Sequence, residues 1–104
     1  MARKKTNNSN IQEFKSKDGD VVLKYRDWDG GSGNLIGFGT LELYDGEITI
    51  YNCMVFKNNK GSAFLAMPQH QGTDGQYYNT AYITKDSDLS NQIEQIMSDY
   101  FKNV

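Results

Sequence analysis

The chain contains very few of the residues that build disulfides, metal centres and nucleophilic active sites. Its 104 residues include one cysteine, Cys53, one histidine, His70, and one proline, Pro68. One cysteine cannot form an internal disulfide, so the composition is typical of a reducing, cytoplasmic setting. A zinc site needs more nitrogen and sulfur ligands than these residues provide, and neither Ser62 nor Ser90 has an evident base partner. We therefore expect no metal, no cofactor and no enzymatic activity.

Long apolar segments are also missing. No run approaches the ~18 residues that span a membrane as a helix, and the N-terminus has no hydrophobic signal core. We therefore expect a protein that neither enters a membrane nor is secreted. A chain of 104 residues is long enough for one domain with a modest core.

The charges are unevenly distributed along the chain. The net charge is −2, but residues 1–26 carry seven basic and three acidic side chains, whereas residues 27–104 carry four basic and ten acidic ones. Binding to phosphate needs local positive charge, so the N-terminal quarter is the better candidate for contact with a nucleic acid.

The first segment of the chain offers almost nothing to bury. We expect residues 1–12 to form a disordered basic tail and residues 13–104 to form the single domain. Within the tail, Arg3, Lys4 and Lys5 either contact phosphate or act as a solubilising arm.

Glycines and aromatic residues favour β-structure with tight turns. Runs rich in aromatic and β-branched residues predict strands at 21–26, 35–44, 47–56 and 76–84, with a short strand at 64–67. Asp45-Gly46 predicts a two-residue turn, and Gly37 and Gly39 indicate a bend or a close approach of the backbone. The strand at 47–56 is apolar on both alternating faces, so we expect it to lie centrally. Its two faces are Ile48, Ile50, Met54 and Phe56 on one side and Tyr51, Cys53 and Val55 on the other.

Residues 62–83 are predicted to form the centre of the fold. The apolar run that ends at Pro68 is followed by a polar loop at 69–73 and by the turn pair Asp74-Gly75. An aromatic run then returns. We interpret this pattern as one buried strand, a polar excursion and a returning strand of the same sheet.

The last element is predicted to be a helix. Ser87 is a suitable N-cap, and an apolar stripe with helical spacing follows it. The stripe consists of Leu89, Ile93, Ile96, Met97 and Tyr100, and the residues outside it are Ser90, Gln92, Glu94, Gln95 and Asp99. The predicted fold class is α+β, a small antiparallel sheet of about five strands with the C-terminal helix packed on it.

A longer pattern surrounds the central stretch. The box Phe64-Leu65-Ala66-Met67-Pro68 is followed, six residues after its proline, by Asp74-Gly75. Further matches are Asp45, Glu47, Asn58, Asn59, Gly61, Tyr77, Ala81, Ile93 and Tyr100. In this pattern residues 45–101 resemble the SpoVG (septation protein) family, in a divergent form like that of a mobile-element or phage copy. The resemblance implies a homodimer formed by pairing sheets, which binds DNA or RNA and regulates gene expression and division.

The chain also departs from that family pattern. After the Ala-Met-Pro box the family typically has a serine and basic residues, whereas this chain has Gln69-His70-Gln71. At the start of the helix the family typically has an arginine and a lysine, whereas this chain has only Lys85 nearby. The family's proline corresponds to Ile83 here. The scaffold therefore matches better than the basic positions do.

The first functional hypothesis is that the protein binds single-stranded DNA or RNA as a non-catalytic regulator. Cations would contact phosphates, and exposed aromatic rings would stack on unpaired bases. Tyr78 and Tyr82 share a parity and would form one platform if their face is open; otherwise they are core or dimer contacts. The candidate binding residues are Arg3, Lys4, Lys5, Lys24, Arg26, Trp28, Lys57, Lys60, Tyr78, Tyr82 and Lys85.

The second hypothesis is an acidic protein-interaction module. In this interpretation the acidic body, or a surface that mimics nucleic acid, binds and inhibits a basic partner protein. The acids of the predicted helix would form the contact face, and they are Asp86, Asp88, Glu94 and Asp99.

Overall fold

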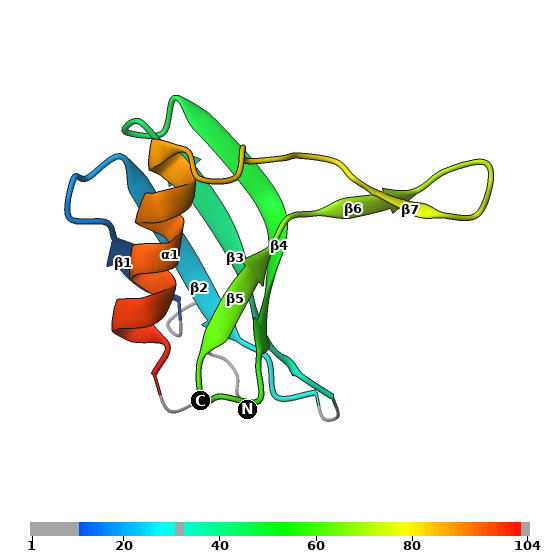
Figure 1. Ribbon diagram of the computed structural model, residues 1–104, viewed down its shortest axis with the longest axis horizontal. Helices are drawn as coiled ribbons and strands as arrows, with labels where there is room; N and C mark the ends of the chain where they lie inside the picture. The colour runs from blue at the N-terminus through cyan, green and yellow to red at the C-terminus, as the bar shows by residue number, and fades with distance from the viewer. Residues whose placement is uncertain (1–10, 31–32, 103–104) are drawn as a thin grey trace.

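The computed structural model describes residues 11–30 and 33–102, which form an α+β domain (Figure 1). One helix packs on a five-stranded antiparallel sheet with the strand order β1-β2-β3-β4-β5, which confirms the predicted fold class. The strands of the sheet are β1 (Gln12–Lys15), β2 (Val21–Asp27), β3 (Leu35–Leu43), β4 (Ile48–Lys57) and β5 (Ala63–Ala66). The remaining elements are β6 (Gln69–Gln71), β7 (Tyr77–Asn79) and α1 (Asp88–Tyr100).

The core lies between α1 and one face of the sheet. Alternation along β2 buries Val21, Leu23 and Tyr25, and these residues meet Ile96 and Phe101 from the helix side. The helix contacts β1, β2 and β5, so both edges of the sheet bend towards it. The opposite face of the sheet is therefore the convex one.

Two glycines of β3 make room for core side chains. A Cβ atom at Gly37 would lie 2.3 Å from the ring of Tyr25, and one at Gly39 would lie 2.6 Å from Leu23. The Tyr25 hydroxyl donates a hydrogen bond of 2.9 Å to the carbonyl of Ile36, so the ring passes directly over this glycine-lined part of the strand. Of the two alternatives predicted for these glycines, a bend or a close approach at the backbone, the structure shows a close approach, and it is made by side chains of β2.

A β-bulge interrupts β4. Tyr51 and Asn52 together oppose the single residue Thr40 of β3, and Asn52 adopts a left-handed backbone with φ of 65°. The extra residue reverses the alternation, so Ile50 and Cys53 both face the helix. The predicted division of this strand into two faces is therefore wrong after residue 50, because simple alternation cannot anticipate a bulge. The strand does lie inside the sheet, between β3 and β5, as expected.

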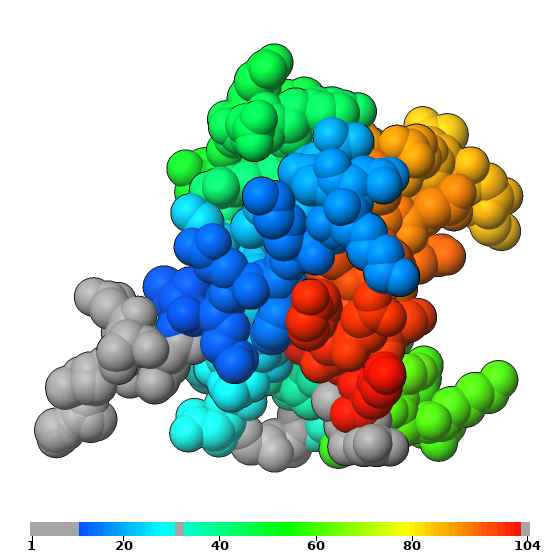
Figure 2. All heavy atoms as spheres, turned by 90° about the vertical axis from the view of Figure 1, so that its left-hand side faces the viewer, coloured from blue at the N-terminus to red at the C-terminus, as the bar shows by residue number. Residues whose placement is uncertain are grey.

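Helix α1 begins as the sequence predicts. The hydroxyl of Ser87 accepts a hydrogen bond of 3.1 Å from the backbone N–H of Ser90. The predicted stripe is largely buried, but Tyr100 is half-exposed and stacks on Phe14 of β1 with 4.7 Å between ring centroids. Figure 2 shows β1 and α1 side by side on this flank of the molecule. In the part of the chain described, this 13-residue helix is too short and too polar to cross a membrane.

Gln92, which the sequence pattern places outside the buried stripe, is in fact buried. Its carbonyl oxygen accepts a 2.6 Å hydrogen bond from the hydroxyl of Ser16, and its amide donates to the carboxylates of Asp20 at 3.1 Å and Asp88 at 3.0 Å. Gln92 is 4% exposed and Ser16 is 5% exposed. This polar network fixes the helix to the turn between β1 and β2.

Two strand predictions are wrong. The first predicted strand begins at residue 21, but β1 precedes it and pairs Gln12 with Tyr25, so the tail predicted for residues 1–12 extends too far. Only Phe14 is partly buried in β1, and one apolar residue gives no alternation to detect. Residues 1–10 lie outside the described residues.

The predicted strand at 76–84 does not return to the main sheet. Only Tyr77–Asn79 is a strand, and it pairs with β6, inside the segment predicted to be a loop. All side chains of β6 and β7 are exposed, so this hairpin has no apolar face to place on the sheet. We call the hairpin, residues 69–79, the arm, and it projects away from the body (Figure 1).

The Gln92 network predicts a measurable loss of stability. Gln92→Ala leaves the Ser16 hydroxyl and the Asp20 carboxylate without their buried partner, so we expect the free energy of unfolding to fall by about 1–3 kcal/mol in urea denaturation. Asn91→Ala is the matched control, because Asn91 is exposed and alanine is the better helix former. An equal loss in both variants would show that the network contributes nothing.

Candidate nucleic-acid interface

The convex face of the sheet, which we call the open face, is not covered by another element within residues 11–30 and 33–102. Lys24 and Arg26 of β2 point to it because the alternate residue Leu23 is buried beneath the helix. Trp28, just after β2, continues this alternation and lines up with them. The strand register adds Phe38, Thr40, Glu42, Thr49, Tyr51, Met54, Phe56 and Phe64. Three predicted site residues are thus brought together.

Trp28 presents part of its indole to solvent in a fixed orientation. The side chain is 46% exposed, and its ring packs edge-on against Phe38 with 5.5 Å between centroids and 79° between planes. The backbone of Gly30 lies against the same indole, since a Cβ there would fall 2.0 Å from a ring carbon. An aromatic ring held in this way loses little conformational entropy when a base stacks on it.

The cations of the open face differ in their partners. The Nζ atom of Lys24 lies 2.9 Å from Oε2 of Glu42, and the hydrogen bond to this carboxylate raises the pKa of Lys24. No other ion pair occurs among the residues described, so Arg26 has no carboxylate partner there. Lys15 and Glu13 of β1 share this face through their register with β2. Three cations and two carboxylates make the open face weakly positive.

Two hollows mark the open face. The first, of about 610 Å³, is bordered by Lys24, Arg26 and Glu42 on one side and by the bulge residues Tyr51 and Asn52 on the other. The second, of about 730 Å³, lies between the bulge and the base of the arm, where Tyr77 and Pro68 form its far wall. Tyr51 is 66% exposed and borders both hollows, so it links them into one continuous surface.

The predicted residue Tyr78 contributes mainly to the arm itself. Its hydroxyl donates a hydrogen bond of 2.5 Å to Asp74, and this bond, followed by one from the backbone N–H of Gln76, lowers the pKa of Asp74. The same bond raises the pKa of Tyr78. On the neighbouring strand, Nδ1 of His70 lies 3.0 Å from the Thr80 hydroxyl. Together with the β6–β7 ladder and the hydrogen bonds of Gln69 with Asn79 and of Gln71 with Gly75, these contacts stabilise the hairpin.

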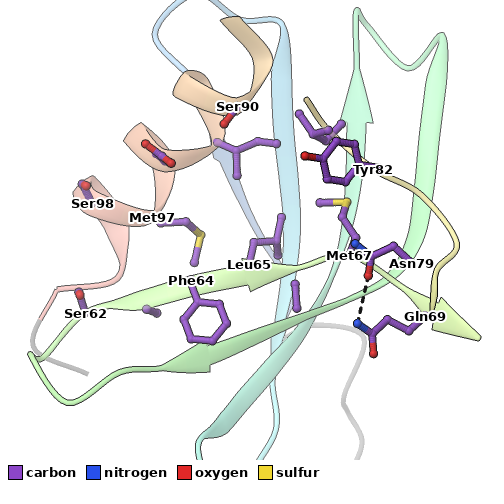
Figure 3. A pocket seen from close by; sticks show the side chains of 15 residues that line it. Ser62, Phe64, Leu65, Met67, Gln69, Asn79, Tyr82, Ser90, Met97 and Ser98 are labelled. Atoms are coloured by element: carbon purple, nitrogen blue, oxygen red, sulfur yellow. Dashed lines mark hydrogen bonds between the residues drawn. The ribbon is translucent and has the colours of Figure 1, made fainter. Parts of the chain in front are cut away.

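Tyr82 lies on the other side of the molecule from the open face. It borders a groove of about 590 Å³ between α1 and the free edge of β5, which we call the helix-side groove (Figure 3). Figure 3 shows Met97 of the helix pointing across this groove towards Leu65 of β5. Because β7 ends at Asn79, Tyr78 and Tyr82 do not share a strand, and the single platform suggested for them is not formed.

The remaining predicted residues are dispersed. Lys57 ends β4 and Lys60 lies in the turn before β5, whereas Lys85 precedes the helix. All three are exposed. Arg3, Lys4 and Lys5 lie outside the described residues.

Sequence reasoning missed five aromatic residues that border the open face, and they are Phe38, Tyr51, Phe56, Phe64 and Tyr77. Phe38 and Tyr51 lie in predicted strands, but alternation alone does not say which face a helix will cover. The bulge at Asn52 further hides Tyr51 by reversing the pattern after it. Tyr77 and Tyr78 are adjacent, so in a strand their side chains point to opposite faces. This is the only sequence signal that could have identified Tyr77.

The arm predicts a specific change in acid titration. The pKa of Asp74 is lowered from 3.8, so its carboxylate stabilises the folded arm above that pH, and the contribution is lost as the pH falls through the lowered pKa. In Tyr78→Phe the largest cause is removed, and we expect the Asp74 pKa to rise towards 3.8 in a carboxyl NMR titration. Tyr77→Phe is the control and leaves the Asp74 pKa unchanged. A rise of equal size in both variants would contradict the assigned contact.

The chain was compared with protein-family models, with curated proteins and with solved structures, and none of the three comparisons found a match. The resemblance to the SpoVG family therefore depends on the quoted residues alone and stays a prediction.

Proposed function

We propose that this protein binds single-stranded DNA or RNA across the open face and acts as a non-catalytic regulator. The observation that carries the proposal is the half-exposed Trp28 indole beside Arg26, a cation without a carboxylate partner among the residues described. A base stacked on the indole would bring its phosphate within reach of the neighbouring guanidinium. Tyr51 and Tyr77 extend the aromatic surface towards the arm.

Single strands suit this surface better than duplexes. The bases of a duplex are stacked on one another, so their faces are not available to protein side chains, whereas those of a single strand are. The open face also has few cations, and a duplex binder that depends on phosphate contacts needs more. The resemblance to the SpoVG family supports the same assignment, with a role in gene expression or division in the cytoplasm.

The binding test is fluorescence anisotropy with labelled single-stranded oligonucleotides. We expect the binding constant to fall with salt with a log–log slope of about −1.5 to −2, as for two or three phosphate contacts on a single strand. Trp28→Ala should weaken binding roughly tenfold through the loss of one stacked base. Arg26→Gln should make the salt slope shallower by about 0.7.

The matched controls lie away from the open face. Tyr44→Ala removes an exposed aromatic ring at the turn between β3 and β4, outside both hollows and the helix-side groove, and Lys102→Gln removes an exposed cation just after the helix. Both should bind as the unaltered protein does. Absence of binding at low salt, or losses as large in these controls, would overturn the proposal.

We also propose that the functional unit is a homodimer. Among residues 11–30 and 33–102, the four-residue strand β5 pairs only with β4 and ends the sheet, so within that part of the chain its outer edge has no partner strand. The helix-side groove runs beside this edge and offers Leu65, Met67 and Met97 as apolar contacts. Pairing of two copies along β5 would join their sheets.

The homodimer is tested by light scattering after size-exclusion chromatography. We expect a mass twice the 11.8 kDa of the chain at micromolar concentration, with dissociation on dilution. A monomer mass at every concentration up to about 100 μM, a weak affinity by the usual scale, would contradict it.

An acidic protein-binding surface is the second candidate. Glu94 borders the helix-side groove, and Asp99 is exposed near the end of the same helix with no ion pair in the region described. A basic partner would find these carboxylates unpaired. A partner captured from lysate after nuclease treatment, together with no oligonucleotide binding, would favour this function over the first.

A further inference from the structure

The first hollow of the open face contains a carboxylate, which a surface that binds only phosphate would not be expected to hold. Glu42 borders this hollow together with Lys24, Thr40 and the two bulge residues. A carboxylate repels a phosphate and reduces the attraction of the neighbouring lysine for it. Its presence calls for a ligand group that donates hydrogen bonds.

The Glu42 carboxylate is held in place by one ion pair that leaves acceptor positions for a ligand. Only Oε2 of its carboxylate is paired with the Lys24 ammonium, at 2.9 Å. A carboxylate has about four acceptor positions, so one lysine contact leaves most of them available. The side chain is partly buried, with 29% of its surface exposed, and this limits the directions from which a donor can approach.

The bulge supplies a second recognition group in the same hollow. It places both Tyr51 and Asn52 opposite one residue of β3, and both residues border the hollow. Tyr51 offers an exposed ring for stacking. Asn52 offers an amide, and its positive φ shows that the chain holds this side chain in a backbone conformation that glycine would adopt more easily.

We propose that this hollow binds one unpaired guanine of the nucleic acid, an inference that rests on the proposed function. The base would stack on Tyr51 and donate N1–H and the exocyclic N2–H to Glu42. The O6 atom would accept from the Asn52 amide or the Lys24 ammonium. Guanine alone among the four common bases has two adjacent donors on its Watson–Crick edge, which is the arrangement that a carboxylate accepts.

The test compares the four bases at one position. A short oligothymidine with a single central dG, dA or dC is titrated against the protein and compared with the unsubstituted strand. We expect the dG strand to bind roughly tenfold more tightly than the others, as for one bidentate base contact. Glu42→Gln should abolish this preference because an amide offers one acceptor and a competing donor.

Two variants separate base recognition from charge and from folding. Glu47→Gln makes the same change in net charge at an exposed turn position outside the hollow, and it should keep the preference. Asn52→Gly removes the amide but permits the left-handed backbone, so the bulge should remain and the preference for dG should weaken. Circular dichroism verifies the fold of each variant.

Each outcome has one meaning. Equal binding of all four strands, or a preference for dC, overturns the guanine site while leaving single-strand binding intact. A preference for dG that survives Glu42→Gln also overturns it. Absence of binding to every strand at low salt overturns the proposed function itself.

Discussion

One short helix has to close the core of a five-stranded sheet, and it can do so from one side only. Helix α1 has 13 residues, which gives a length of about 20 Å, and it contacts both edges of the sheet by drawing them inward. The buried Gln92 network fixes its position against the turn between β1 and β2. This arrangement leaves the aromatic residues of the convex side uncovered, because no second layer lies over them within the part of the chain described.

The uncovered side of the sheet has an unusual composition, which is why we propose it as the binding surface. In a two-layer domain the outer face normally carries polar residues, yet here Trp28, Phe38 and Tyr51 stand among threonines and charged groups. The bulge in β4 adds a polar amide next to the most exposed of these rings. Hydrophobic contact and hydrogen-bonding capacity therefore alternate over a short distance, which is the combination that unpaired nucleotides require.

The sequence was sufficient for the parts of the fold that depend on local patterns. The Asp45-Gly46 turn, the Ser87 cap and the apolar stripe of the helix each have a local physical cause, and each is present in the structure. Strand membership was harder to predict. The short strand β1 has a single apolar residue, and the arm has strand-forming tyrosines but no buried face, so burial in the rest of the molecule decided both cases. For the candidate site, the sequence marked Lys24, Arg26 and Trp28 as separate candidates but did not show that they lie together on the face that the helix leaves open.

The bulge also determines which face of the sheet each residue of β4 occupies on either side of it. Ile50 faces the helix before the bulge, and Cys53 and Val55 face it after the bulge. Ile50 and Cys53 are three residues apart, so in a regular strand they would lie on opposite faces. Pairing β4 without a bulge while Asn52 stays in the ladder would carry Met54 and Phe56 to the helix side and turn Cys53 and Val55 to water, whereas deletion of Asn52 would leave Ile50, Cys53 and Val55 on the helix side in plain alternation. The left-handed backbone at Asn52 thus lets the strand carry one surplus residue while Cys53 and Val55 stay in the interior and Met54 and Phe56 stay on the outer surface.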